Sequence, residues 1–64
     1  MLRGQLQQAL NHVQATIDLT DDMRTRQKKV WDLLNDTRME LALHGNEMGW
    51  KVRWDDERRE WLVR

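Results

Sequence analysis

The stretch WKVRWDDERREWLVR, residues 50–64, holds three of the 4 tryptophans in the chain. Apolar and charged residues alternate before its central charged run, and the apolar residues Trp61, Leu62 and Val63 follow it, which is typical of two half-buried strands joined by a turn. Folded about its centre, the stretch places Trp54 opposite Trp61. The same fold places Val52 opposite Val63, and cross-strand pairs of this kind stabilise a hairpin. We predict a two-stranded antiparallel β-hairpin whose packing or partner-binding face is formed by Trp50, Val52, Trp54, Trp61 and Val63.

This hairpin needs a covering surface, because an isolated two-stranded hairpin is marginally stable in water. Residues 2–44 offer one, since helix-forming residues dominate the segment. The a and d positions of its heptad pattern carry no formal charge when His44 is neutral. A charge-free seam is typical of a coiled coil or helical bundle. The neutral Thr16, Thr20 and Thr37 weaken such a core but specify register and oligomer number.

The seam requires a partner helix, and a second copy of the chain is the simplest source. We predict an oligomer interface made by Leu6, Ala9, Val13, Met23, Val30, Leu34 and Leu41. The fold class is therefore mainly α: a long amphipathic helix, as a coiled coil or a helical hairpin, followed by the β-hairpin.

Two arrangements of the helical segment remain open. One is a continuous helix of about 43 residues, roughly 65 Å long. The other is a break within residues 18–22, after which Asp18 or Thr20 caps a returning helix and Asp21 and Asp22 lie in its first turn. Asp18 and Asp22 would repel each other in a continuous helix. The break contains no glycine or proline, however, and the seam keeps its phase across it, so we slightly favour the continuous helix.

The chain of 64 residues forms one domain at most, 1–64. Its main joint is the stretch GNEMG, residues 45–49, which resembles a glycine helix cap followed by a turn. The joint separates the helical oligomerisation segment, 2–44, from the Trp-rich β-hairpin, 50–64.

Composition excludes several functions. Eleven basic and eleven acidic residues cancel, so no net field attracts nucleic acid or an anionic membrane. Cysteine is absent, which leaves oligomerisation as the usual means of stabilising so small a domain. Cysteine, serine and tyrosine nucleophiles are all missing, and no phosphate loop or carboxylate pair is visible. We expect no enzyme activity, no cofactor and no metal site.

Two clusters were weighed as nucleic-acid sites. Trp54 and Trp61, with the basic residues between them, have the ingredients of a stacking platform for single strands. A second cluster, formed by Arg24, Arg26, Lys28 and Lys29, would suit phosphate contacts. Acidic residues are interspersed with both, so we favour a hydrophobic packing role for the tryptophans and a solvated helix face for the basic cluster. Nucleic-acid binding is therefore a third, weaker hypothesis.

The motif VRWD, residues 52–55, followed by EWLV, residues 60–63, resembles the hairpin of the fibritin foldon of tailed phages. That resemblance implies a hairpin closing the end of a trimeric coiled coil. This chain lacks the proline-containing lead-in of the foldon, and Glu57 and Arg58 stand where its hairpin turn has glycine.

The leading hypothesis is a non-enzymatic homo-oligomerisation or assembly module, a dimer or trimer whose seam pairs helices and whose Trp hairpin caps the bundle. The alternative is a small phage- or plasmid-type regulator that binds another protein through the Trp/Arg hairpin, because tryptophan and arginine are enriched in binding hot spots. No apolar run is long enough to span a membrane. We expect a location in the cytoplasm, or in a particle assembled there.

Overall fold

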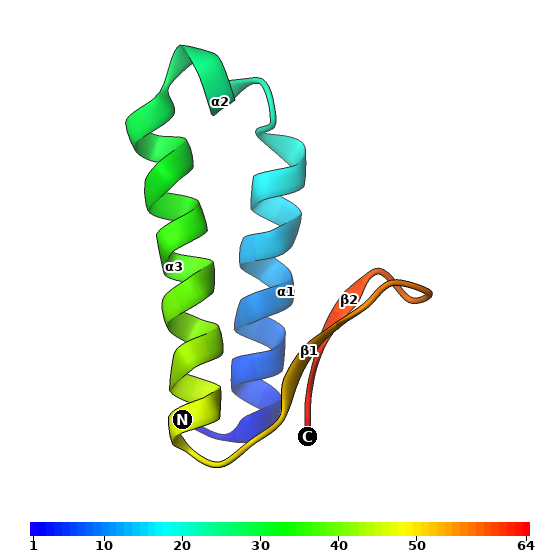
Figure 1. Ribbon diagram of the computed structural model, residues 1–64. Helices are drawn as coiled ribbons and strands as arrows, with labels where there is room; N and C mark the ends of the chain where they lie inside the picture. Colours follow the sequence, from blue (N-terminus) through cyan, green and yellow to red (C-terminus); the bar gives the residue numbers. More distant parts are fainter.

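The computed structural model, which describes residues 1–64, consists of two antiparallel helices with a β-hairpin packed on one side (Figure 1). Helix α1 spans Arg3–Leu19 and helix α3 spans Lys28–Glu47. The single-turn helix α2, Met23–Arg26, lies in the connection between them. Strands β1, Val52–Asp55, and β2, Glu60–Val63, form the hairpin. The predicted mainly α architecture with a C-terminal antiparallel hairpin is confirmed. None of the helices combines the length and apolar character that crossing a membrane requires.

The helical segment folds back on itself, so the continuous helix that we favoured is wrong. α1 ends at Leu19, and the molecule measures only 36 Å along its longest axis. A continued helix would place Asp18 above Asp22 and leave the apolar faces of both halves exposed, whereas folding back packs those faces together.

The helix caps predicted at the break are also wrong. The Thr20 hydroxyl donates to the carbonyl of Thr16 (2.6 Å), one turn earlier in α1. The carboxylate of Asp18 accepts a hydrogen bond from the Gln14 side chain (3.1 Å). Both side chains therefore bond within α1, which is the local competition expected of threonine and aspartate near helix ends.

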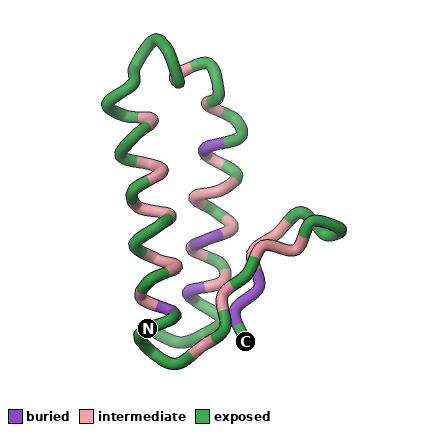
Figure 2. The backbone as a smooth tube through the Cα atoms, viewed as in Figure 1, coloured by how far each residue is buried: buried purple, intermediate pink, exposed green.

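The core of the molecule lies where both helices meet the hairpin. Leu6 and Leu10 of α1 are fully buried and form a cluster with Val63 of β2. Ile17 is buried further along α1. The buried positions accordingly concentrate on one side of α1 and at the end of β2 (Figure 2). The partly buried residues packed against the cluster are Leu41, Ala42, Trp50, Val52 and Trp61.

Helix α3 ends in a Schellman motif at the second glycine of the predicted joint. Gly49 has a φ of +85°, the left-handed conformation that glycine adopts without strain. The Trp50 amide bonds to the Gly45 carbonyl and the Gly49 amide to the Asn46 carbonyl, both at 3.0 Å, which is the hydrogen-bond pair of this motif. A glycine cap within residues 45–49 is thus present. It lies at Gly49, so the helix continues beyond the predicted end at residue 44.

Gly45 is inside α3 and has a different role. A Cβ atom at this position would lie 2.5 Å from Cγ2 of Val52 and 2.8 Å from Cδ2 of Leu6. Both distances are shorter than van der Waals contact. Glycine therefore allows β1 and α1 to approach the backbone of α3 at the point where helix and hairpin meet.

The hairpin has the predicted register. Val52 pairs with Val63 and Trp54 with Trp61. The two indole rings meet edge to face, with centroids 5.6 Å apart and an interplanar angle of 67°. This geometry places the positive edge of one ring against the negative face of the other.

Residues 56–59 form the hairpin loop, which points away from the helices (Figure 1). The Asp55 carboxylate accepts hydrogen bonds from the backbone amides of Glu57 (3.1 Å) and Arg58 (3.3 Å). Arg59 has a φ of 55°. The loop therefore requires a left-handed residue near its end, as four-residue hairpin loops often do, and accepts an arginine there.

Candidate functional site

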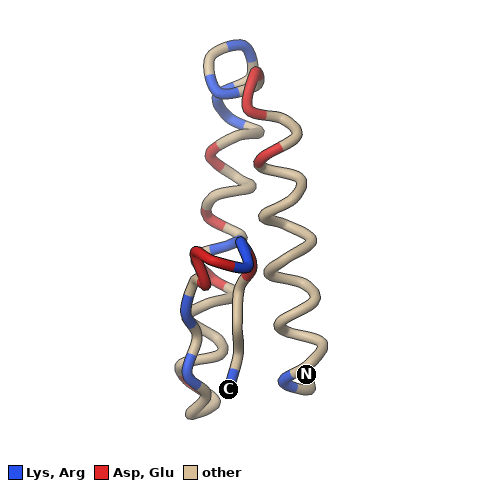
Figure 3. The backbone as a smooth tube through the Cα atoms, turned by 90° about the vertical axis from the view of Figure 1, so that its right-hand side faces the viewer, with Lys and Arg blue, Asp and Glu red and all other residues tan.

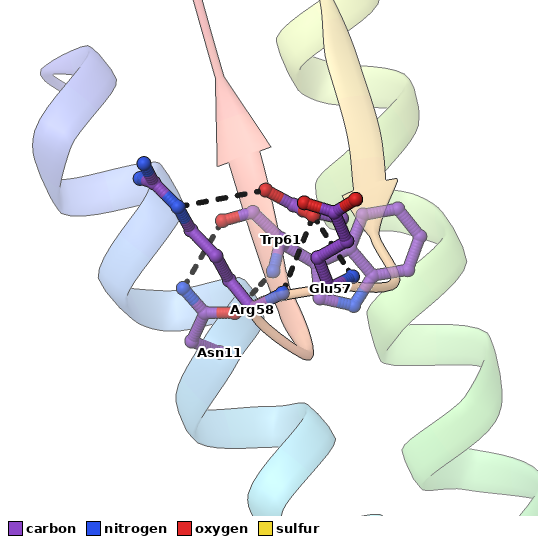
Figure 4. Close-up of polar contacts among 5 residues, drawn as sticks. Asn11, Glu57, Arg58 and Trp61 are labelled. Carbon is purple, nitrogen blue, oxygen red and sulfur yellow. Dashed lines mark hydrogen bonds and ion pairs between the residues drawn. The ribbon is translucent and has the colours of Figure 1, made fainter.

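The outer edge of β2 is closed by side-chain amides from α1. Lys51 and Arg64 exchange both backbone hydrogen bonds. By the alternation of an antiparallel ladder, the backbone groups of Trp61 and Val63 therefore point away from β1. Asn11 of α1 accepts from the Trp61 amide and donates to its carbonyl, as Figure 4 shows.

One turn earlier in α1, Gln7 accepts from the Val63 amide (2.9 Å). Gln7 and Asn11 are four residues apart and so share one face of the helix. Together they occupy the place of a third strand.

A second polar network joins both helices to the tryptophans. Oε1 of Gln14 accepts from the indole Nε1 of Trp61 (3.1 Å) and from the guanidinium of Arg38 (2.9 Å). Arg38 also donates to Asn35 (2.9 Å). The chain has a single ion pair, Arg58 with Asp55 at 3.9 Å, so these amide oxygens hold Arg38 without a carboxylate.

These residues border an open groove of about 580 Å³ between the hairpin and α3. Trp54, Trp61, Met39 and Ala42 give it apolar walls. Its polar lining consists of Gln14, Asn35, Asp36 and Arg38. A mainly apolar concavity with a few converging polar groups is the usual form of a binding site.

The predicted hairpin residues gather on one face, but they differ in surroundings. Val63 is buried, and Trp50, Val52 and Trp61 pack against the core. Trp54 is partly buried, with its ring against Trp61 and its indole nitrogen donating to Asp56 (3.1 Å). Within the single chain the hairpin lies along the side of the helix pair, whereas the foldon resemblance implies a hairpin at the end of a coiled coil.

The predicted interface residues divide between the core and the surface. Leu6 is fully buried and Leu41 packs against the core cluster. Val30 is 39% exposed. The remaining members, all partly buried, are Ala9, Val13, Met23 and Leu34. Helix pairing within the chain thus covers part of the seam and leaves part of it accessible.

The basic cluster of residues 24–29 lies at the turn of the helical hairpin, far from the β-hairpin (Figure 3). Asp21 and Asp22 precede it directly in the same turn. The cluster and the tryptophans of the β-hairpin therefore do not form one surface.

Gln7, Asn11 and Gln14, which attach the hairpin, are not among the site residues predicted from the sequence. A signal was available, because amide side chains recur at i, i+4 and i+7 on a helix with no Lys, Arg, Asp or Glu between Arg3 and Asp18. Arg38 was missed because nothing in its neighbourhood distinguishes it from any exposed helical arginine.

No protein-family model, curated protein or solved structure matches this chain. Its function is therefore argued from its own surfaces. The two that stand out are the groove beside the hairpin and the accessible part of the seam.

Proposed function

We propose that the chain is a non-enzymatic homo-oligomerisation module, in which two helix pairs associate through the seam face. We use this name for Ala9, Val13, Thr16, Val30 and Thr37, seam residues on the side of the helix pair that faces away from the hairpin. Two such pairs placed face to face make a four-helix bundle with two-fold symmetry. The hairpin then covers the opposite side of each pair.

The observation that carries this proposal is the lack of charge on α1. No Lys, Arg, Asp or Glu lies between Arg3 and Asp18, and Figure 3 shows this stretch as an uninterrupted uncharged segment. Its sides toward α3 and toward the hairpin are covered. Its third side carries Ala9, Val13 and Thr16, which are only partly buried in a single copy and offer apolar groups that a second helix pair would cover.

The threonines of the seam support the same proposal. The hydroxyl of Thr16 donates to the His12 carbonyl (3.0 Å), and that of Thr37 donates to the Leu33 carbonyl (2.8 Å). A threonine bonded to its own helix needs no polar partner on a neighbouring helix. Its methyl group can therefore pack in an interface without leaving a buried hydroxyl unsatisfied.

The test is the solution mass of the whole chain by analytical ultracentrifugation. We expect a dimer at micromolar concentration. Val30→Glu should produce a folded monomer, because it places a charge on the seam face. Met39→Glu changes an exposed residue on the hairpin side and should leave the dimer intact. A wild-type chain that is a stable folded monomer would contradict the proposal.

A further inference from the structure

The outer edge of β1 has no counterpart to the amides that close β2. In this antiparallel pair the backbone N–H and C=O groups of Trp61 and Val63 point toward α1. By the same alternation, those of Val52 and Trp54 point outward, away from β2. No hydrogen bond joins those outward groups to the rest of the chain. An edge strand with free N–H and C=O groups is a template for one more strand.

The hairpin face opposite to the tryptophans is basic at its base, around the buried Leu62 that pairs with Arg53. Lys51 and Arg64 lie directly opposite each other, and Arg53 follows Lys51 by two residues, so all three side chains share this face. They surround an open hollow of about 430 Å³. None of them forms an ion pair. The acidic residues of this face, Asp55 and Glu60, pair with each other at the loop end of the strands. Asp55 already binds Arg58 and the loop amides.

The other face of the same edge borders an apolar surface. Met39, which is 64% exposed, lines the groove under Trp54. Leu43, 52% exposed, lies one helical turn further along α3 on the same side. A strand beside β1 would cover both residues.

We propose that the edge of β1 binds an extended segment of another protein in which acidic and apolar residues alternate. The segment adds a third strand to the hairpin. Its acidic side chains face Lys51 and Arg53, and its apolar side chains enter the groove over Met39. This surface lies opposite the seam face, so the inference goes beyond self-association and does not depend on it.

Charge selects this occupant over the alternatives. A second copy whose β1 paired antiparallel about Val52 would bring Lys51 and Arg53 of the two strands together, which is unfavourable. Pairing about Trp54 would place Arg53 opposite Asp55, whose carboxylate already binds Arg58 and the loop amides. A nucleic acid would satisfy the three cations, but it would leave the backbone groups of Val52 and Trp54 and the apolar groove unused. A strand of alternating acidic and apolar residues would pair with the cations, bind the free backbone groups and fill the apolar groove.

The experiment uses the whole chain, labelled with ¹⁵N, and the peptide acetyl-Glu-Leu-Glu-Leu-Glu-Leu-Glu-amide at low salt. We expect saturable binding, with the largest amide shifts at Val52 and Trp54 and slower hydrogen exchange of both amides. The same peptide with lysine in place of glutamate should not bind. Two further peptides carry N-methyl groups on alternate residues, one on every leucine and the other on every glutamate. One of them should lose binding and the other should keep it, because only one of these two sets of amides faces β1.

Two pairs of variants locate the contacts. Arg53→Glu should weaken binding at least tenfold, whereas Arg26→Glu, the same charge change at the far end of the helix pair, should not. Met39→Glu should weaken binding severalfold, whereas the seam variant Val30→Glu should bind normally even if it is monomeric. This last comparison separates failure of strand addition from failure of self-association.

Three results would overturn the inference. The first is absence of peptide binding to a correctly folded chain. The second is binding that leaves the exchange of Val52 and Trp54 unchanged. The third is displacement of the peptide by an oligothymidylate that binds more tightly and protects neither amide, which would identify the basic face as a phosphate site.

Discussion

The two edges of the hairpin have the same length, but only one of them is hydrogen-bonded to the rest of the chain. The β2 edge is closed by Gln7 and Asn11, whose amides satisfy the outward backbone groups of Trp61 and Val63. The β1 edge leaves the equivalent groups of Val52 and Trp54 without partners in the chain. Natural sheets usually protect exposed edges with charge, bulges or covering elements.

This difference indicates what attaches the hairpin and what remains free. Attachment depends on β2 and α1, which are far apart in sequence. β1, which follows α3 directly, contributes Val52 to the core but leaves its edge open. A two-stranded sheet is thus stabilised from one side only, and the other side remains available for recognition.

Removing the Asn11 side chain would leave both edges of the hairpin with unpaired backbone groups. Of the changes considered, it should reduce the free energy of unfolding most. Asn11→Ala leaves the amide and carbonyl of Trp61 without partners in a half-buried position. We expect a loss of about 2–3 kcal/mol in the free energy of unfolding. Urea unfolding followed by tryptophan fluorescence measures it. Gln8→Ala, on the exposed side of the same helix, should change stability by less than about 0.5 kcal/mol.

Gly45→Ala tests the close approach on the β1 side. The new methyl would collide with Val52 and Leu6, so the hairpin must move away from α3. We expect a net destabilisation of about 1–2 kcal/mol, because the cost of overpacking exceeds the gain in helix propensity. The matched change is Gly4→Ala, where a Cβ meets nothing within 4 Å. It should stabilise the chain, and equal effects at the two glycines would contradict the close approach.

Hydrogen exchange compares the edges directly in the unmodified chain. The amides of Trp61 and Val63 should exchange at least about tenfold more slowly than those of Val52 and Trp54, a difference of roughly 1.4 kcal/mol in local opening. NMR exchange rates at neutral pH measure it. Equal rates at the two edges would mean that the side-chain amides of α1 do not act as a third strand.

The smallest effect is expected in the loop that joins the two strands. Arg59→Gly relieves a left-handed conformation that costs arginine more than glycine. Because glycine also has more freedom to lose on folding, the net stabilisation should be about 0.5–1 kcal/mol. Thermal unfolding detects it. Arg58→Gly, outside the left-handed region, should not stabilise the chain.

The sequence predicts the elements of this fold better than their arrangement. Alternation and the symmetric tryptophans were sufficient for the hairpin and its register, because that pairing is local. The sequence does not decide between a continuous helix and a break within residues 18–22. A heptad pattern shows which residues are apolar, but it does not show whether the helix that covers them belongs to the same chain. The sequence places Gly45 in the joint, because sequence alone does not distinguish a glycine required for close approach from one required for positive φ.

The candidate surfaces were predicted less completely. The tryptophans were identified, but the groove also needs Met39 and Arg38 of α3, whose proximity to the hairpin depends on the tertiary fold. The free edge of β1 follows from the ladder together with the position of α1. It could not be recognised before Asn11 and Gln7 were located on the other edge.

The hydrogen bond from the Val63 amide to Gln7 also constrains how the molecule forms. It joins positions 56 residues apart, so a loop of almost the whole chain must close before it forms, at a cost in chain entropy. During synthesis α1 emerges first, yet its amide face has no backbone partner until β2 has left the ribosome. Until then this uncharged helix can be covered only by α3 or by a neighbouring nascent chain. The interval before β2 emerges is therefore the period in which misassembly is most probable.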